Sequence, residues 1–461
     1  MSKTKLRGAW CVAAAVTGLA TAASGQTSLS IYRDGRVVVR RTLPQALERG
    51  RNSLTLRLDA FDPATFFSPD TAVAVLSATA RFPSAKGDAL ARAVGQTLSF
   101  VRGDDTIRAT VVRVDPPQYR LSDGRLLLAS PGEPLFPAEL VRTAPEAVVV
   151  LEASRARPRT EVAYVTQGVT WEALYHVILL GARASITGTA TVNSQTLRAD
   201  SAEVQLVAGA IRRTRPGAPP VPMEGVMMRA QAGGVAQDAF AAEEAVGETH
   251  VYQLPGRLTV EPSVPVTTAL FPRNTAPVVQ ELIVPGVLPW RGWIGQNPEP
   301  DRVPVQVWYT LRRARNTAFG DRPLPAGTVQ LYQADASGRV QLIGEASNNH
   351  TAPGRDLRLQ SGDAFDVTAE RVQTEFNQEV IPPAQRGMSQ RQRVTAAYRV
   401  TIANAKATPV TVDIREARFG DWKITQSSVP AEKLSSTESR FRLTVPAGGT
   451  ATLTYTVQIE S

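Results

Sequence analysis

Cysteine is almost absent from this chain of 461 residues, because Cys11 is the only one. Without a second thiol the chain can form neither an intramolecular disulfide nor a cysteine-based zinc site. Trp10 stands directly before Cys11, where a lipoprotein signal needs a small residue, so lipid attachment is not expected.

Histidine is scarce as well, and the three copies are widely spaced. His176, His250 and His350 stand 74 and 100 positions apart, with no HxH or HExxH spacing between them. His176 follows a tyrosine in an apolar run and is expected to be a packed or edge residue. The sequence predicts no metal ligand and no cofactor.

Long apolar runs are missing after residue 25. The first 25 residues have a basic start, then a small and apolar run, and end in Ala-Ser-Gly. This order is typical of a secretory signal peptide, with cleavage before Gln26. The run is too short, and too rich in Ala, Thr and Gly, for a membrane-spanning helix of about 20 residues. We therefore expect a periplasmic or secreted protein with no transmembrane segment in the mature chain.

Lysine contributes only six of the 51 basic residues, so the net charge of +9 is carried mainly by arginine. The signal segment supplies three of these charges, which leaves about +6 (9 − 3) on the mature chain. The charge is dispersed along the sequence. Alternatively, the positive charge attracts the protein weakly to anionic polymers or to lipid headgroups. Nucleic acid is not an expected partner, because the protein is exported and has no basic helix.

Helical periodicity is also rare, and alternation of period 2 dominates, as over residues 54–59. Glycine and proline, 33 each, recur throughout and are typical of turns between short strands. The predicted fold class is all-β, with several antiparallel modules and an immunoglobulin-like β-sandwich at the C-terminus. Asp34-Gly35 lies between apolar runs and predicts a hairpin. One short helix is predicted over 85–96.

The predicted modules follow these patterns in chain order. After the signal peptide (1–25) we expect an N-terminal β region with the short helix (26–97) and a small antiparallel β unit (98–160). A β domain (161–315) and the β-sandwich (316–461) complete the chain. Segment 214–248 shows no period and predicts a mobile insert inside the third module.

Four motifs occur in a characteristic order: Tyr32-Arg33-Asp34-Gly35, then Gly168-x-x-Trp171-x-Ala173-x-Tyr175, Leu324–Val329, and Val445–Gly449. With them the chain resembles the mucoidy-inhibitor-like family of exported bacterial proteins, whose C-terminal region is a domain of unknown function. The resemblance covers nearly the whole mature chain. It implies a link to envelope polysaccharide and supplies no catalytic residues. Longer members of that family carry an extended coiled coil between the N-terminal β region and the main domain. In this chain only the short predicted helix over 85–96 occupies that place.

Motifs for catalysis are missing, since there is no nucleophile elbow and no phosphate-binding loop. Carboxylate pairs stay open as an alternative, because glycosidases pair such groups in space and not in sequence. The candidates are Glu370 with Glu375, Asp363 with Asp366, and Asp301 near Trp308. Each also fits a solvated strand end or a turn.

Aromatic residues form only 6% of the chain, yet three tryptophans fall within 19 positions: Trp290, Trp293 and Trp308. Exposed tryptophan faces stack on sugars and on partner proteins, so these three are the candidate binding residues. Core packing at one end of a sandwich is the alternative. Trp171 and Trp422 lie within strand patterns and are predicted to be core residues.

These patterns favour an exported, non-enzymatic envelope protein that acts as a binding or scaffolding module. Its expected partner is an envelope protein or a polysaccharide, and no catalytic residue is predicted. Two alternatives stay open: a carbohydrate- or peptidoglycan-binding module, and a carbohydrate-active hydrolase. A row of exposed tryptophans would favour the binding module, whereas clustered acids in a groove would favour the hydrolase.

Overall fold

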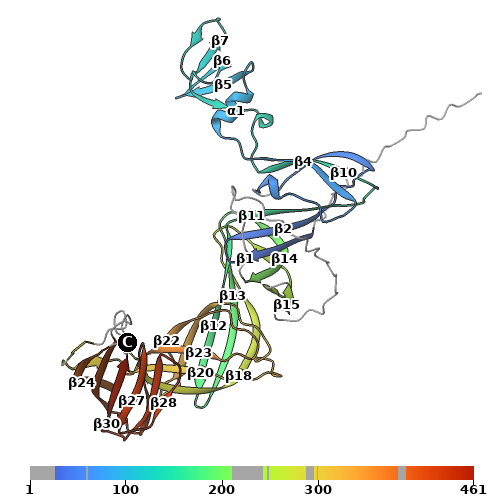
Figure 1. The fold of residues 1–461 in the computed structure, drawn as a ribbon. Helices are drawn as coiled ribbons and strands as arrows, with labels where there is room; N and C mark the ends of the chain where they lie inside the picture. Colours follow the sequence, from blue (N-terminus) through green and yellow to red (C-terminus); the bar gives the residue numbers. More distant parts are fainter. Residues whose placement is uncertain are drawn as a thin grey trace, which may run out of the picture. The chain divides into compact units, whose positions relative to one another are not determined.

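The chain is almost entirely β-structure. The structure, a computed structural model, describes residues 26–58, 61–209, 242–246, 249–286, 295–297, 299–382 and 391–460 (Figure 1). Strands account for 64% of the residues and helix for 3%. The predicted all-β fold is therefore confirmed. Among the described residues, no helix combines the length and the apolar character that crossing a bilayer requires.

Two compact units divide the chain in an interleaved way. Unit 1 comprises residues 1–30, 36–168 and 197–202, and unit 2 comprises 31–35, 169–196 and 203–461. Strands β1 (Gln26–Tyr32) and β14 (Ala199–Ala208) contribute residues to both units. The modules predicted from the sequence are contiguous, whereas these units are not, because strands pair across long separations in the chain.

The predicted hairpin is present, with its turn (residues 31–35) in unit 2 and β2 (Arg36–Leu43) in unit 1. Gly35 has a φ of +87° between β1 and β2, and β2 then pairs antiparallel with β11 (Thr160–Gln167). A three-stranded sheet in the order β3-β10-β4 is built from β3 (Gly50–Leu56), β10 (Glu146–Ala153) and β4 (Val73–Arg81). Two short 3-10 helices are also present in unit 1: Pro63–Thr65, and Ala138–Leu140, whose Leu140 packs against the core of the small module described next.

A small module is inserted between β4 and β10. Its sheet has the order β8-β7-β6-β5-β9. The strands are β5 (Thr97–Arg102), β6 (Asp105–Arg113), β7 (Gln118–Leu121), β8 (Leu126–Leu127) and β9 (Glu133–Leu135). The predicted helix is present as α1 (Lys86–Arg92), next to this sheet in Figure 1. Leu90 and Ala93 share a core with Phe100 and Tyr119, so the expected boundary at 97/98 separates the helix from its own core.

Unit 2 contains a ten-stranded sheet in which distant strands lie side by side. Its continuous order is β22-β21-β12-β13-β18-β26-β29-β28, and β20 pairs with both β18 and β23. The strands before the sandwich are β12 (Val169–Leu180), β13 (Arg183–Ser194), β18 (Val266–Val284), β20 (Gln306–Leu311), β21 (Gly327–Ala334), β22 (Val340–Asn348) and β23 (Leu357–Asp363). β12 and β21 run parallel, with Ala173 opposite Gly327. A Cβ on Gly327 would lie 2.3 Å from the Ala173 carbonyl oxygen, so only glycine fits this register.

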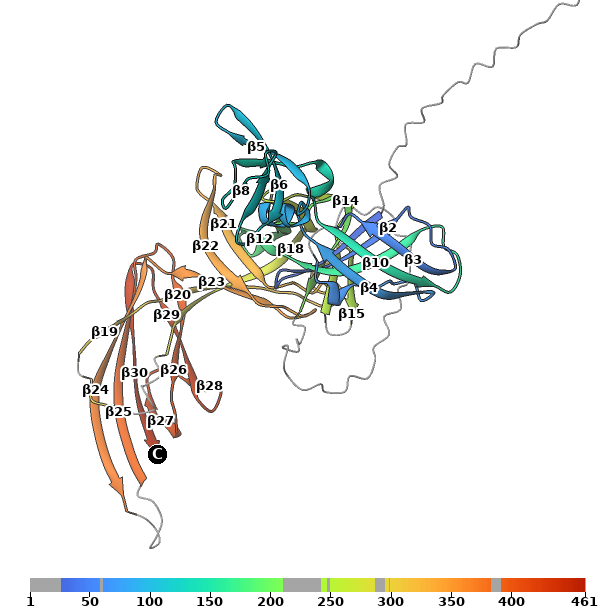
Figure 2. The ribbon, with the colours of Figure 1, turned by 90° about the horizontal axis from the view of Figure 1, so that it is seen from above.

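The C-terminal part of unit 2 is a β-sandwich, with its strands labelled in Figure 2. One sheet has the order β19-β24-β25-β30-β27 and the other layer is β26-β29-β28. The strands are β19 (Asp301–Val303), β24 (Val367–Ile381), β25 (Arg391–Asn404), β26 (Val410–Ala417), β27 (Asp421–Ser427), β28 (Ala431–Lys433), β29 (Glu438–Val445) and β30 (Gly449–Glu460). Both layers share one core, which also includes Leu282, Val284 and Val303. The sandwich thus recruits residues before the expected boundary at 316, while β21 and β22 pair elsewhere.

The predicted insert over 214–248 contains a strand. Residues 242–246 form β15 (Ala242–Val246), which pairs antiparallel with β16 (Thr249–Gln253). β16 in turn pairs with β14, which also pairs with β17 (Leu258–Val260). A loop was predicted here, and for these five residues that prediction was wrong, because they pair with β16 in a way that the composition does not indicate. Residues 214–241 and 247–248 lie outside the described part of the chain.

Both tryptophans predicted for the core are buried. Trp171 is 1% exposed and Trp422 is 6% exposed. Trp422 is the second residue of β27, and its indole N–H donates a hydrogen bond of 2.6 Å to the Ser436 carbonyl oxygen. The Arg418 guanidinium lies 5.5 Å from the centre of the ring, and the Lys433 ammonium lies 4.5 Å from it.

We expect Trp422→Ala to lower the free energy of unfolding by about 3–5 kcal/mol, as deletion of a large core aromatic does. Equilibrium denaturation measures the loss. Phe365→Ala is the matched control, because Phe365 is 95% exposed and its truncation should change stability by less than about 0.5 kcal/mol. A loss below about 1 kcal/mol for Trp422→Ala would contradict a core role.

Candidate functional site

The loop between β20 and β21 is held by hydrogen bonds to its backbone. Tyr175, in the middle of β12, donates its hydroxyl to the Pro325 carbonyl oxygen at 2.6 Å. The side-chain amide of Asn348 donates to the same oxygen at 3.2 Å, and Tyr252 donates to the Pro323 carbonyl at 3.1 Å. Burial raises the pKa of Tyr175 well above its ordinary value, so the phenol stays protonated and able to donate. Proline has no backbone N–H to donate, so the loop is fixed through its carbonyl groups, which accept hydrogen bonds from these side chains.

The turn after β1 reaches the same loop. Arg33 donates to the Ala326 carbonyl oxygen at 2.8 Å and lies 5.8 Å from the centre of the Trp171 ring. The Ala326 N–H donates to Nδ1 of His350 at 3.3 Å. Three of the motifs that carry the family resemblance therefore meet at one place, although they lie 293 positions apart at the extreme.

Arg313 is the buried centre of this region. Its side chain is 1% exposed and donates to the carbonyl oxygens of Phe319, Arg322, Ala352 and Arg355. Burial lowers the pKa of Arg313, although nearby Tyr175 and Asp356 act in the opposite direction. Arginine suits this position because its planar guanidinium presents five donors in a fixed geometry.

The carbonyls bound by Arg313 belong in part to a tight turn that precedes β23. Pro353-Gly354 occupies the centre of this turn, Gly354 has a φ of +73°, and the Arg355 N–H donates to the Ala352 carbonyl at 3.2 Å. Pro-Gly is the pair that a type II turn favours, because the third position needs positive φ. The Gly354 N–H also donates to the Gly320 carbonyl at 2.8 Å, which fixes the turn against the preceding loop.

Asp356 joins the turn to the end of β20. One carboxylate oxygen accepts the Arg313 backbone N–H at 2.9 Å, and the other accepts from Arg312 at 2.6 Å. Partial burial alone would raise the pKa of Asp356, but these two donors outweigh it and the pKa lies below its ordinary value. The carboxylate is therefore ionised at neutral pH.

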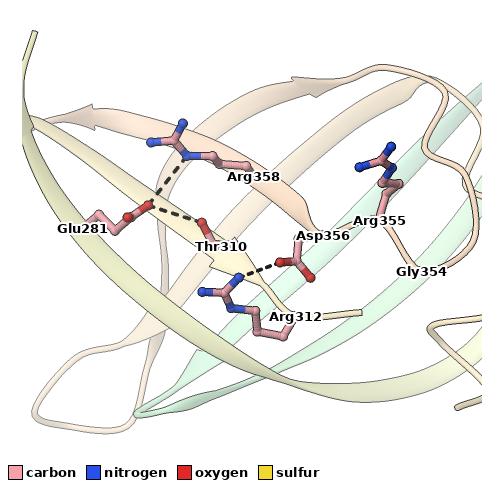
Figure 3. Close-up of a pocket in the computed structure, with 7 residues that line it drawn as sticks. All are labelled: Glu281, Thr310, Arg312, Gly354, Arg355, Asp356 and Arg358. Carbon is pink, nitrogen blue, oxygen red and sulfur yellow. Dashed lines mark hydrogen bonds and ion pairs between the residues drawn. The ribbon is translucent and has the colours of Figure 1, made fainter. Parts of the chain in front are cut away.

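These contacts frame a hollow of about 490 Å³, which we call the arginine hollow (Figure 3). Its lining is made of Glu281, Thr310, Arg312, Gly354, Arg355, Asp356 and Arg358. Glu281, on β18, accepts from the Thr310 hydroxyl at 3.4 Å and lies 3.6 Å from Nε of Arg358. Within the described part of the chain, the Arg355 guanidinium has neither a hydrogen bond nor an ion pair.

Arg358 extends from the arginine hollow across the ring of Trp308. Its guanidinium carbon lies 4.4 Å from the ring centre, and the Trp308 N–H donates to the Gln306 side chain at 3.0 Å. Two further hollows, of about 460 Å³ and 220 Å³, are each lined by both Trp308 and Arg358. Three hollows of unit 2 thus have Arg358 in their lining.

The tryptophans predicted to bind ligand have different outcomes. Trp308 is half-buried and does line the candidate site, but Arg358 lies over its ring. The sequence predicted that an exposed Trp308 ring would stack on a ligand. In the structure the ring instead contacts the Arg358 guanidinium. Trp290 and Trp293 lie outside the described residues.

The carboxylate candidates do not gather in this site. Glu370 and Glu375 are exposed on β24, and Asp363 and Asp366 are exposed around the end of β23. Asp301 lies opposite Arg371 of β24, whereas Trp308 lies opposite Glu281 of β18. The ring of His176 stacks on Tyr332 with centres 6.1 Å apart. Across the described ranges, no group of three or more His, Cys, Asp and Glu side chains could hold a metal ion.

The arginine hollow was not predicted from the sequence. Its cations are Arg312, Arg355 and Arg358, and neither of the two segments that supply them matches a known binding motif. The only local signal is Pro353-Gly354 followed by Arg-Asp-Leu-Arg, which predicts a turn that leads into a charged strand. No family model matches this chain, and no curated protein matches it.

We expect Arg313→Met to lower the free energy of unfolding by about 3–5 kcal/mol, because it leaves buried carbonyl groups without donors. Arg313→Lys should recover only part of the loss, since an ammonium lacks the planar fork. The exposed Arg399 gives the matched control, and Arg399→Met should change stability by less than about 0.5 kcal/mol. Wild-type stability of Arg313→Met in urea denaturation would rule out this role.

Proposed function

We propose that this protein is an exported, non-enzymatic component of the cell envelope that binds a ligand on the β-sheet face around Trp308 and Arg358. The observation that carries the proposal is that Arg358 lines three hollows of this face. Hollows with a few convergent polar groups are where ligands bind most often. The preferred partner is an envelope polysaccharide or protein, in line with the resemblance to the mucoidy-inhibitor-like family.

A rigid support favours binding at this face. β20 is paired on both sides, with β18 and with β23, so Trp308 and Thr310 are fixed by two ladders. The Pro-Gly turn before β23 is fixed by Arg313. A site on paired strands loses less conformational freedom when it binds than a site on free loops does.

Export forms the second part of the proposal. The basic start, the apolar run and the Ala-Ser-Gly site support removal of residues 1–25. We expect mass spectrometry of the protein recovered from outside the cytoplasm to give a chain that begins at Gln26. An exported protein that retains Met1 would contradict this expectation.

Binding is tested by titration of purified envelope polysaccharide and of peptidoglycan fragments while the intrinsic tryptophan fluorescence is followed. We expect saturable binding of one of these ligands, and Arg358→Gln should weaken it about tenfold, the effect of losing one charge-assisted hydrogen bond.

The control is Arg399→Gln, which removes one positive charge from an exposed position of β25 and should leave affinity unchanged. The absence of binding to any fragment, or binding that Arg358→Gln leaves unchanged, would overturn the proposed site. Turnover of a fragment would overturn the non-enzymatic assignment and would favour the hydrolase.

A further inference from the structure

We infer that the arginine hollow binds the carboxylate group of an acidic sugar, and that the adjoining hollows accommodate the neighbouring units of the same polysaccharide chain. This inference rests on the proposed function, and it adds the chemical class of the ligand. It starts from the charges that line the hollow.

The lining of the arginine hollow has an excess of positive charge. The lining includes three guanidinium groups, of Arg312, Arg355 and Arg358, and two carboxylates, of Glu281 and Asp356, which leaves one positive charge (3 − 2). Arg312 is bonded to Asp356 at 2.6 Å, and Arg358 lies 3.6 Å from Glu281. Arg355 is exposed and has no such partner within the described ranges. It is therefore the cation available to an incoming anion.

A second guanidinium lies beside the same turn. The Nε atom of Arg315 is 2.9 Å from the place where a Cβ on Gly354 would stand, so the absence of a side chain there gives Arg315 its room. Arg315 is exposed, and no bond joins its side chain to another described residue. Arg315 thus lies beside Gly354, and Arg355 follows Gly354 in the chain. A carboxylate matches them because a guanidinium can donate two parallel hydrogen bonds to its two oxygens.

Trp308 explains why the site suits an acidic sugar better than a neutral one. A neutral sugar would stack on a bare indole face, but Arg358 lies over this ring at 4.4 Å. The ring holds the guanidinium in place through a cation–π contact while leaving its N–H groups able to donate. The face around Trp308 therefore presents a guanidinium, which is ion-paired with Glu281 at 3.6 Å, where a neutral-sugar site would present an aromatic surface.

The size of the region favours a chain over a single small anion. Hollows of about 490 Å³, 460 Å³ and 220 Å³ share Arg358, and polar groups such as Gln360, Ser347 and Gln306 line the two smaller ones. Hydroxyl and amide groups of this kind pair with sugar hydroxyls. An acidic polysaccharide offers both the carboxylate and the hydroxyls along one chain.

The experiment compares tetragalacturonate with its full methyl ester, which keeps the sugar hydroxyls and removes the charge. With the full chain in low salt, titration calorimetry should show the acid binding at least about tenfold more tightly than the ester. Rising salt should weaken binding of the acid only, because surface charges are screened. Monomeric galacturonate should bind at least about tenfold more weakly than the tetramer.

Variants of Arg355 test whether its positive charge, and not the surrounding surface, determines the affinity for the acid. Arg355→Gln should weaken binding of the acid about tenfold and leave binding of the ester unchanged. Arg355→Lys should lose part of the affinity, because lysine keeps the charge without the fork. Arg399→Gln, with the same loss of charge on an exposed strand, should bind like the wild type, and thermal unfolding should show all variants folded.

Equal affinity for acid and ester, with Arg358→Gln weakening both, would overturn the inference and leave the proposed binding face intact. Binding of the acid that Arg355→Gln does not change would likewise overturn it. If neither compound binds, while a neutral glycan without carboxylates does, the proposed function stands and the acidic-sugar assignment falls. If no glycan binds, both fall.

Discussion

The arrangement of unit 2 depends on how the buried charge of Arg313 is satisfied. A guanidinium that is 1% exposed must have all of its donors paired, and among the residues that the structure describes no carboxylate is bonded to this one. Backbone carbonyls from two loops therefore have to converge on it. That requirement fixes the Pro353-Gly354 turn relative to the end of β20, and so it places Arg355 and Asp356 at the rim of the arginine hollow.

The sandwich solves the same problem in another way. Arg371 is paired with Glu416 at 2.6 Å, and both side chains are largely buried. Burial would lower the pKa of Arg371, but the charge of Glu416 outweighs it and the pKa is raised. Arg418 completes the group by donating to Ser439 at 2.7 Å. Here an ion pair between β24 and β26 joins the two layers. At Arg313 backbone carbonyls take the place of the carboxylate, and the neighbouring Asp356 bonds instead to the Arg312 side chain and the Arg313 backbone N–H.

The Trp308 face shows how an aromatic residue changes its role with its neighbours. Half-buried, with its N–H bonded to Gln306 and a guanidinium over its ring, Trp308 acts as a support for Arg358. The chemistry offered to a ligand is then that of arginine, with planar geometry and a permanent charge. For the same reason, clusters of tryptophan in a sequence do not by themselves distinguish a sugar-stacking surface from a packed one.

Local pattern was enough to predict the all-β fold, the hairpin at Asp34-Gly35, the short helix, and the burial of Trp171 and Trp422, because each follows from spacing within about ten residues. The site could not be predicted in that way. Glu281, Trp308 and Arg358 meet because β20 pairs with β18 on one side and with β23 on the other. Trp308 supports a guanidinium, and is not a bare stacking surface, because this pairing places Arg358 over its ring. Module boundaries failed for the same reason, as β18 serves both the large sheet and the sandwich core. Strand pairing joins residues across long separations in the chain, and no local pattern records which strands become neighbours.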